Sequence, residues 1–352
     1  MTSRIKIRRP DDWHLHLRDG VMLNTVLPYS SREYGRAMIM PNLVPPLKNT
    51  KDIYLYRERI LNALPEGHKF TPLMTMYLSD DTDPKDLIDG FNHGIIEAVK
   101  LYPANATTNS AHGVSSIDKV AHILDVMQRS DIPLLIHGES TDIHIDMFDR
   151  EARFIEDVLI PLSFRYPELR IVLEHATTIE AIDFVQESGV NIGATITPQH
   201  VFLNRNALFK GGLRPHNYCL PVLKREKHRA AIVRAITSTQ NESFFLGTDS
   251  APHERLRKES SCGCAGIFNS PIALAVYATI FESANALDKL EAFTSINGPR
   301  FYRKPVSDEF ITLLKQEQTV PEMIEVPGEG QLSPFLAGEK INWVVECEME
   351  VH

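Results

Sequence analysis

Residues 11–17 read DDWHLHL, with Arg18 directly after them, and this stretch decides how we interpret the chain. Side chains alternate between the two faces of a strand, so His14, His16 and Arg18 share one face. The opposite face carries Trp13, Leu15 and Leu17, which suits packing against helices. Alone, the HxH pattern is equally compatible with a polar surface strand. A metal held by two imidazoles, with a guanidinium beside it for a substrate anion, is the functional interpretation.

The rest of the chain alternates short apolar strands with amphipathic helices. Strands are predicted at 11–17, 37–41, 70–78, 94–101, 132–137, 169–175, 190–197 and 243–249. Helices are predicted at 50–64, 84–92, 116–129, 151–165, 178–188 and 223–238. Such alternation indicates a parallel sheet of βαβ units. Eight units favour a closed (β/α)₈ TIM barrel, and an open doubly wound sheet is the alternative, weakened by the absence of a Gly-rich phosphate loop.

The length of 352 residues suits a single domain, because such a barrel takes about 250 residues before insertions. We therefore assign 1–352 to one barrel domain. Residues 303–352 form a short C-terminal appendage, with a predicted helix at 308–317 and a strand at 343–351. The long connections 102–115 and 198–222 follow the fourth and seventh strands, and the first is small and polar enough to be a mobile active-site loop.

Composition excludes several classes of partner. The net charge is 37 − 46 = −9 and no basic run occurs, so we predict no nucleic-acid partner. No apolar run is long enough for a signal peptide or a membrane span, so we predict a cytoplasmic protein with no membrane partner. The four cysteines are predicted to be reduced. Cys262 and Cys264 form a CxC pair, but no CxxC pair supports a second metal site there, and we assign it no role.

Further metal-ligand types stand at the ends of other strands. His137 ends the run IPLLI, His175 ends IVLE, and Asp249 follows FFLGT. Barrel enzymes place their catalytic groups at these C-terminal strand ends. Any one of these histidines could be a hydrogen-bonded core residue. Together with the two on the first strand, four imidazoles and one carboxylate predict a site for zinc or a similar divalent ion.

Lys100, late in the fourth strand, is the unusual member of this set. A lysine that extends its amine to the surface is the plain interpretation, since lysine is rarely fully buried. The functional interpretation is a desolvated amine with a lowered pKa.

Longer motifs surround these residues, and their combination is far more specific than HxH alone. They read DDWHLHLRDG, MPNLVPP, KLYPANATTNS, LLIHGE, LEHATT and LGTDSAPH. In this respect the chain resembles the amidohydrolase superfamily, and within it the single-domain bacterial-type dihydroorotases, over residues 1–340.

The resemblance implies a role for each residue. It implies two Zn²⁺ ions per subunit, one held by His14 and His16 with Asp249, the other by His137 and His175, and bridged by a carbamate that CO₂ forms on Lys100. It implies that the substrate is bound by Arg18, Asn42 and His253 at its carboxylate, by His137, and by the backbone of Leu220 and Ala265 at its ring, while Thr107 and Thr108 close over it. It also implies a homodimer.

The activity implied is the reversible, zinc-dependent cyclisation of N-carbamoyl-L-aspartate to (S)-dihydroorotate in pyrimidine biosynthesis. We predict hydroxide between the metals as nucleophile and Asp249 as proton shuttle. A hydantoinase-like cyclic-amide hydrolase is the nearest alternative, although Arg18 and Asn42 suit a substrate with a free carboxylate. A non-catalytic metal-binding scaffold is the other, although all six predicted ligands are present.

Overall fold

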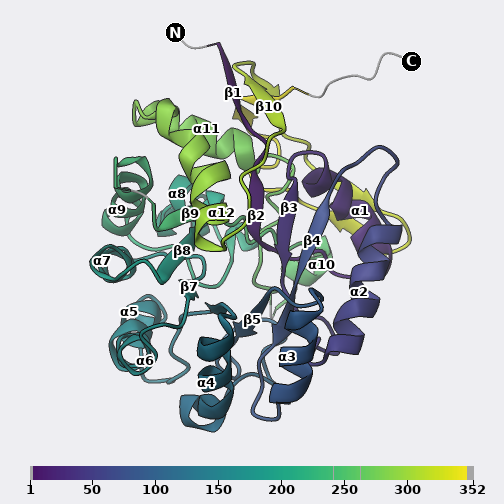
Figure 1. The fold of residues 1–352 in the computed structure, drawn as a ribbon. Coiled ribbons are helices and arrows are strands. Elements are labelled where there is room, and N and C mark those ends of the chain that lie inside the picture. Colours follow the sequence, from purple (N-terminus) through teal and green to yellow (C-terminus); the bar gives the residue numbers. More distant parts are fainter. Residues whose placement is uncertain (1–2, 241, 262, 347–352) are drawn as a thin grey trace.

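The computed structural model of the chain describes residues 3–240, 242–261 and 263–346, and its centre is a barrel of parallel strands (Figure 1). Among the described residues, the eight-stranded sheet runs in chain order, each strand parallel to the next. Its strands are β2 (Asp11–Leu15), β3 (Arg36–Ile39), β4 (Thr71–Tyr77), β5 (Ala98–Leu101), β6 (Leu134–Ile136), β7 (Ile171–Leu173), β8 (Ile192–Ile196) and β9 (Phe244–Leu246). All eight predicted strands are thus confirmed, each of them shorter than predicted.

The barrel closes between its first and last strands. The Asp249 N–H donates to the His14 carbonyl at 2.8 Å, and the His16 N–H donates to the Ser250 carbonyl at 3.1 Å. Leu15 and Ser250 also form a parallel bridge. The (β/α)₈ prediction is therefore confirmed, and the open-sheet alternative is excluded. The bonds that close the barrel come from the segments carrying the predicted ligands.

Helices cover the outside of the barrel, and one or more of them follow each barrel strand (Figure 1). They are α1 (Gly20–Ser31), α2 (Thr50–Asn62), α3 (Pro84–Asn92), α4 (Ala121–Ser130), α5 (Arg150–Phe154), α6 (Ile160–Arg165), α7 (Ile179–Glu187), α8 (Pro198–Phe202), α9 (Glu226–Thr237), α10 (Arg255–Lys258), α11 (Ala273–Ser283) and α12 (Asn297–Phe301). The predicted helix 151–165 contains a π-helical turn between α5 and α6, and the predicted helix 116–129 begins as a 3₁₀ turn. None of the described helices is both long and apolar enough to cross a membrane.

Local sequence explains where these helices begin. Asn49 accepts a hydrogen bond from the Asp52 N–H at the start of α2, and Thr178 accepts one from the Ala181 N–H at the start of α7. Such caps satisfy N–H groups that have no partner within the helix. Pro84 occupies the first turn of α3, where its missing N–H costs nothing.

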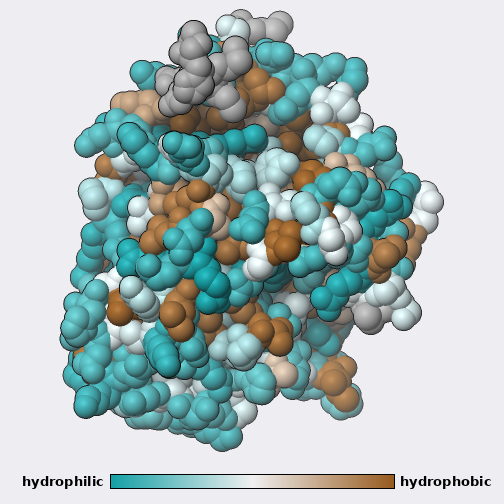
Figure 2. All heavy atoms as spheres, turned by 90° about the vertical axis from the view of Figure 1, so that its right-hand side faces the viewer, coloured by the Kyte–Doolittle hydropathy of each residue, from teal (hydrophilic) through white to brown (hydrophobic). Residues whose placement is uncertain are grey.

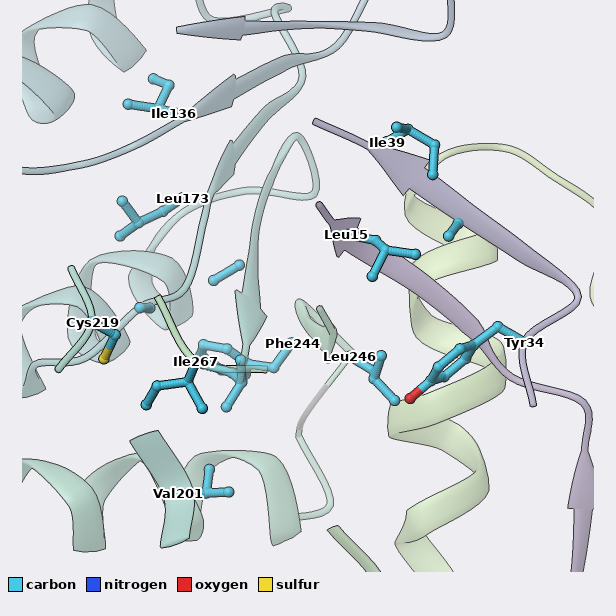
Figure 3. Close-up of a cluster of buried hydrophobic side chains, with 14 of the residues drawn as sticks. Leu15, Tyr34, Ile39, Ile136, Leu173, Val201, Cys219, Phe244, Leu246 and Ile267 are labelled. Carbon is cyan, nitrogen blue, oxygen red and sulfur yellow. The ribbon is translucent and has the colours of Figure 1, made fainter. Parts of the chain in front are cut away.

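The apolar core has two parts. The larger lies between strands and helices and contains outward-facing strand residues such as Leu15, Ile136 and Leu246 (Figure 3). The smaller lies on the inward face of the strands, at the end away from the predicted site. Its members are Trp13, Met38, Met40, Leu73, Ala98, Leu135, Val172, Phe245 and Tyr302.

The placement of Trp13 corrects a prediction. Trp13 was expected to face the helices with Leu15 and Leu17, but it lies in the smaller cluster, where it stacks on Tyr302 at 4.3 Å between ring centroids. The register of β2 shifts between Asp12 and Leu15. A bulge of this kind breaks the strict alternation of side chains, so Trp13 can join the interior without moving Leu15 or Leu17 from the outer core.

The C-terminal appendage contains small antiparallel sheets, and the predicted helix 308–317 is wrong. Phe310–Leu314 forms strand β10, which pairs with the N-terminal strand β1 (Arg4–Arg8) and with β15 (Val344–Val345). The partner strand lies some 300 residues away, and this long-range pairing overrides local helical periodicity. The other strands are β11 (Gln318–Thr319) with β14 (Lys340–Ile341) and β12 (Ile324–Val326) with β13 (Gly330–Leu332). The predicted strand 343–351 is confirmed only at β15, and 347–351 lie outside the described residues.

The face formed by α1, α2 and the β12–β13 hairpin is mostly hydrophilic, with apolar side chains in small separate groups (Figure 2). Scattered apolar residues are normal on a protein surface. This side of the barrel therefore gives no sign of a large buried contact.

Candidate active site

The predicted ligands meet at the C-terminal end of the barrel. Residues in or directly after five different strands bring them there. They are His14 in β2 and His16 just after it, Lys100 in β5, His137 after β6, His175 after β7, and Asp249 after β9. His175 and Asp249 both have positive φ values, 42° and 45°, which turn the chain sharply at the strand ends. All six side chains are buried.

His14, His16 and Asp249 form the first group. The Nε2 atoms of the two histidines are 3.3 Å apart, and Asp249 Oδ1 lies 3.4 Å from His14 Nε2 and 3.1 Å from His16 Nε2. His14 donates its Nδ1–H to Glu174 Oε2 at 2.6 Å, and His16 donates its Nδ1–H to Asn42 Oδ1 at 2.9 Å. Each imidazole therefore directs its Nε2 lone pair at the same point.

His137 and His175 form the second group. His137 donates its Nε2–H to Glu139 Oε2 at 2.8 Å, which turns its Nδ1 lone pair toward His175 Nε2, 3.1 Å away. His175 Nδ1 is buried and has no hydrogen-bond partner among the described residues. The His14 and His175 rings are 5.2 Å apart, so the two groups form one cluster.

This donor set fits metal ions. Burial lowers the pKa of His14, His16 and His175, so these imidazoles are uncharged at neutral pH. Uncharged nitrogens that face one another at about hydrogen-bond distance repel unless a proton or cation lies between them. Imidazole nitrogens and carboxylate oxygens are a preferred environment for zinc, and three of these imidazoles, those of His14, His16 and His137, are oriented by a further carboxylate or amide. His14, His16 and Asp249 each place a ligand atom within 4.8 Å of the others.

Lys100 lies in the same cluster, and no ion pair between described residues includes it. Its side chain is fully buried, and its Nζ has no hydrogen-bond partner within the described part of the chain. The amine lies 5.2 Å from the centre of the Tyr102 ring. Burial lowers the pKa of Lys100 to about 8, against the opposing effect of Glu174 and Asp249. A buried amine without a partner fits a group that gains its partners only when metal ions are bound in the site.

A cavity of about 30 Å³ opens above the cluster. Its lining contains residues of both predicted roles, metal ligands and substrate contacts. The full lining is His14, His16, Arg18, Asn42, Tyr102, Thr107, Thr108, His137, His175, Leu220, Asp249, Ala251, Ala265 and Gly266, of which Tyr102, Ala251 and Gly266 were not predicted. His253 lies just behind, with its Nε2 3.1 Å from Arg18 Nη2 and 2.9 Å from the Ala265 carbonyl oxygen.

Comparison with known proteins agrees with this geometry. The model of the amidohydrolase family matches residues 11–306. The chain belongs to the amidohydrolase family. It is 58% identical over 341 residues to a dihydroorotase of Pectobacterium carotovorum subsp. carotovorum (strain PC1), covering 97% of this chain and 98% of the other, so within the family it belongs to the dihydroorotases.

Solved structures of dihydroorotases have the same fold. That from Saccharomyces cerevisiae, in complex with 5-fluoroorotic acid, has a TM-score of 0.92 and 32% identity, covering 98% of this chain and 99% of the other. That from Campylobacter jejuni has a TM-score of 0.89 and 36% identity, covering 99% of each. The L-hydantoinase of Arthrobacter aurescens, at 12% identity and a TM-score of 0.80 over 97% of this chain and 83% of the other, shares the fold alone. The predicted family is confirmed.

In this amidohydrolase the loop after β5 lies over the cavity. Asn42 Nδ2 donates to the Thr108 carbonyl at 3.2 Å, and Thr108 Oγ1 donates to the Ala265 carbonyl at 3.4 Å. Asn109 Nδ2 donates to the Asn42 carbonyl at 3.0 Å. These bonds hold Thr107 and Thr108 in the lining, as predicted for a loop that closes the site. Its mobility stays a prediction.

The residues that orient the predicted ligands were not predicted from the sequence. Glu174 and Glu139 hold the rings of His14 and His137, and Thr195 Oγ1 donates to Glu174 at 2.6 Å while accepting the His175 N–H at 2.7 Å. A signal was available, since each glutamate stands within two residues of a predicted ligand at the end of an apolar strand. A carboxylate there is rarely buried unless it has a partner.

Proposed function

We propose that this chain catalyses the reversible hydrolysis of (S)-dihydroorotate to N-carbamoyl-L-aspartate, the third step of de novo UMP synthesis. One observation carries the proposal: four imidazoles and Asp249 converge beneath a cavity whose wall also holds Arg18 and Asn42. The family membership agrees with it.

The free carboxylate of the substrate is bound by Arg18. Its guanidinium is fixed by a hydrogen bond from Nε to the Pro252 carbonyl at 3.0 Å, and its Nη2 lies 3.1 Å from His253 Nε2, which leaves N–H groups for an anion. A planar guanidinium suits bidentate contact with a carboxylate. Asn42 and His253 complete this end, and the backbones of Leu220 and Ala265 contact the ring. A hydantoin ring without such a carboxylate leaves Arg18 unused, which favours dihydroorotate.

Two divalent ions, most suitably zinc, fit the cluster. His14, His16 and Asp249 would hold one, His137 and His175 the other, and a carbamate on Lys100 would bridge them. When bound, such ions supply Lewis acidity that polarises the ring carbonyl and lowers the pKa of water. The carbamate would form by addition of the uncharged Lys100 amine to CO₂ with release of a proton to solvent, and it would replace an unpartnered buried amine by an anion whose two oxygens are metal ligands.

Asp249 moves the proton. Water adds its oxygen to the ring amide carbon, the ring C–N bond breaks, and the proton taken by Asp249 passes to the leaving nitrogen. Burial raises the pKa of the Asp249 carboxyl, which favours a carboxylate that accepts a proton and releases it again. Ring closure uses the same groups in the reverse order.

A direct assay tests this function. Purified protein loaded with zinc should hydrolyse dihydroorotate, followed by its ultraviolet absorbance, at least 100-fold faster than hydantoin at equal concentration. Metal analysis of the same sample should give two ions per chain. Equal rates on both substrates would favour the hydantoinase alternative, and bound metal without turnover would favour the scaffold.

We also propose that the chain acts as one domain and as a cytoplasmic homodimer. The pairing of β1 with β10 supports the first point, because it joins the appendage to the segment leading into the barrel. A large groove between α5–α6 and α7 supports the dimer, since Phe164 and Val190 are 81% and 92% exposed in its lining. Light scattering should give twice the chain mass, and Phe164→Glu should reduce it. Cell fractionation checks the location.

A further inference from the structure

Lys258, at the end of α10, is a buried cation outside the metal cluster. Its residue is 4% exposed, and none of the ion pairs within the described residues involves it. Its Nζ donates instead to three backbone carbonyls, those of Tyr218 at 3.0 Å, Cys264 at 3.0 Å and Gly266 at 2.5 Å. An ammonium has three N–H groups, so all of them are used. Burying a charge in this way is costly, which indicates that the contacts serve a purpose beyond filling space.

The three carbonyls belong to two segments that form one wall of the cavity. Tyr218 stands two residues before Leu220, and Cys264 and Gly266 stand on either side of Ala265. Leu220, Ala265 and Gly266 all line the cavity. The Gly266 N–H also donates to the Tyr218 carbonyl at 3.0 Å, so the two segments meet at Lys258.

The geometry of the Cys264–Ala265 peptide bond links the contact at Lys258 to the direction of a cavity N–H group. The Cys264–Ala265 peptide bond is trans, and in a planar trans peptide the C=O and the following N–H point in opposite directions. Because the Cys264 carbonyl points at Lys258, the Ala265 N–H points away from it. This N–H has no hydrogen-bond partner among the described residues, while the Ala265 carbonyl lies 2.9 Å from His253 Nε2.

We propose that Lys258 is a positioning residue for substrate recognition: it clamps the two wall segments and turns the Ala265 N–H toward the ring of the bound substrate. The proposal rests on the proposed function, since it assigns a donor to the ring of that substrate. Lys258 itself does not touch the substrate. Its loss therefore weakens binding of the ring and leaves the metal cluster and Asp249 in place.

The test compares Lys258→Met with Arg257→Met in zinc-loaded protein. Both replace a cation of α10 by a thioether, but Arg257 is exposed. In Lys258→Met we expect the KM for dihydroorotate to rise about tenfold with kcat changed less than threefold, and the Kd for 5-fluoroorotate, measured by calorimetry, to rise by the same factor. Metal content should stay at the wild-type value, and Arg257→Met should keep the wild-type KM and Kd.

The KM against kcat split separates positioning from a merely structural role. A partly unfolded protein loses apparent kcat at unchanged KM, so that result in Lys258→Met would overturn the proposal. If Lys258→Met does not fold, Lys258→Arg replaces it, because a planar guanidinium keeps the charge but cannot direct three N–H groups from one nitrogen. We then expect at least a threefold rise in KM and in Kd, and unchanged values would overturn the proposal. Failure of the proposed function is distinct, since wild-type protein would then not hydrolyse dihydroorotate.

Discussion

The two ends of the barrel interior are built from the same strands yet differ in every chemical respect. Toward the N-terminal ends, the inward positions hold Ala98 in β5, Leu135 in β6 and Val172 in β7, all in the smaller apolar cluster. Two residues further on, the same face carries Lys100, His137 and Glu174. We call the first set the floor and the second the mouth. Along each of these strands, a step of two residues thus leads from the apolar core to the polar site.

The comparison shows what the floor contributes to the mouth. Apolar side chains beneath the cluster exclude water, and this desolvation lowers the pKa of Lys100 and of His14, His16 and His175. The same histidines on a wet surface would stay near their ordinary pKa and would compete less well for metal. The floor stabilises the barrel, whereas the mouth holds groups that cost stability until the metals and substrate are bound.

The largest expected effect is at the mouth. Asp249→Asn should lower kcat by about 10²–10⁴-fold, the range for loss of a general acid–base group, with the fold retained. Steady-state kinetics and circular dichroism measure the two properties. A variant with nearly wild-type turnover would remove Asp249 from the proton shuttle.

Lys100→Met should separate function from stability. Activity and metal content should both fall strongly, because the proposed bridging carbamate can no longer form. The metal-free variant should nevertheless gain about 1–3 kcal/mol in free energy of unfolding, since a buried amine without a partner is replaced by an apolar side chain. Lys85→Met, at an exposed position on α3, is the control and should change neither. Full metal content in Lys100→Met would contradict the carbamate.

Leu135→Ala should give the reverse result at the floor. The side chain is fully buried, so its truncation should cost about 2–5 kcal/mol of stability, measured by urea unfolding. The kcat per folded molecule should stay within about threefold, because Leu135 does not line the cavity. A loss of turnover as large as that of Asp249→Asn would show that floor and mouth are not separable.

The smallest effect should come from a residue on a helix outside the strands of the barrel. Tyr56 on α2 donates its hydroxyl to the backbone carbonyl of Arg18, which has a positive φ of 58°. Tyr56→Phe should raise the KM for dihydroorotate about three- to tenfold with little change in kcat, because Arg18 loses part of its support. Tyr54→Phe, on the exposed face of the same helix, should have no effect. Identical kinetics of the two variants would show that the Tyr56 hydroxyl does not contribute to the position of Arg18.

Local patterns in the sequence predicted the barrel and most of its site. Eight apolar runs alternating with helices required a parallel sheet, and ligand types at the ends of five runs had to meet at one end of it. The Ser-rich CxC segment could not be interpreted, and Cys262 lies outside the described residues. Strand β10 was predicted as a helix because its partner β1 stands at the other end of the chain.

By itself, the sequence predicted the strand order and six candidate ligands, because periodicity and residue type are local properties, and its longer motifs predicted the family. Only the tertiary structure decided which nitrogen of each histidine faces the cluster, since this depends on partners such as Glu174, 160 residues from His14. It also decided that Trp13 faces inward and that Lys258 holds the wall around Ala265. The position of Trp13 depends on a backbone bulge, and the role of Lys258 depends on the direction of carbonyl groups. Neither feature can be predicted from residue type.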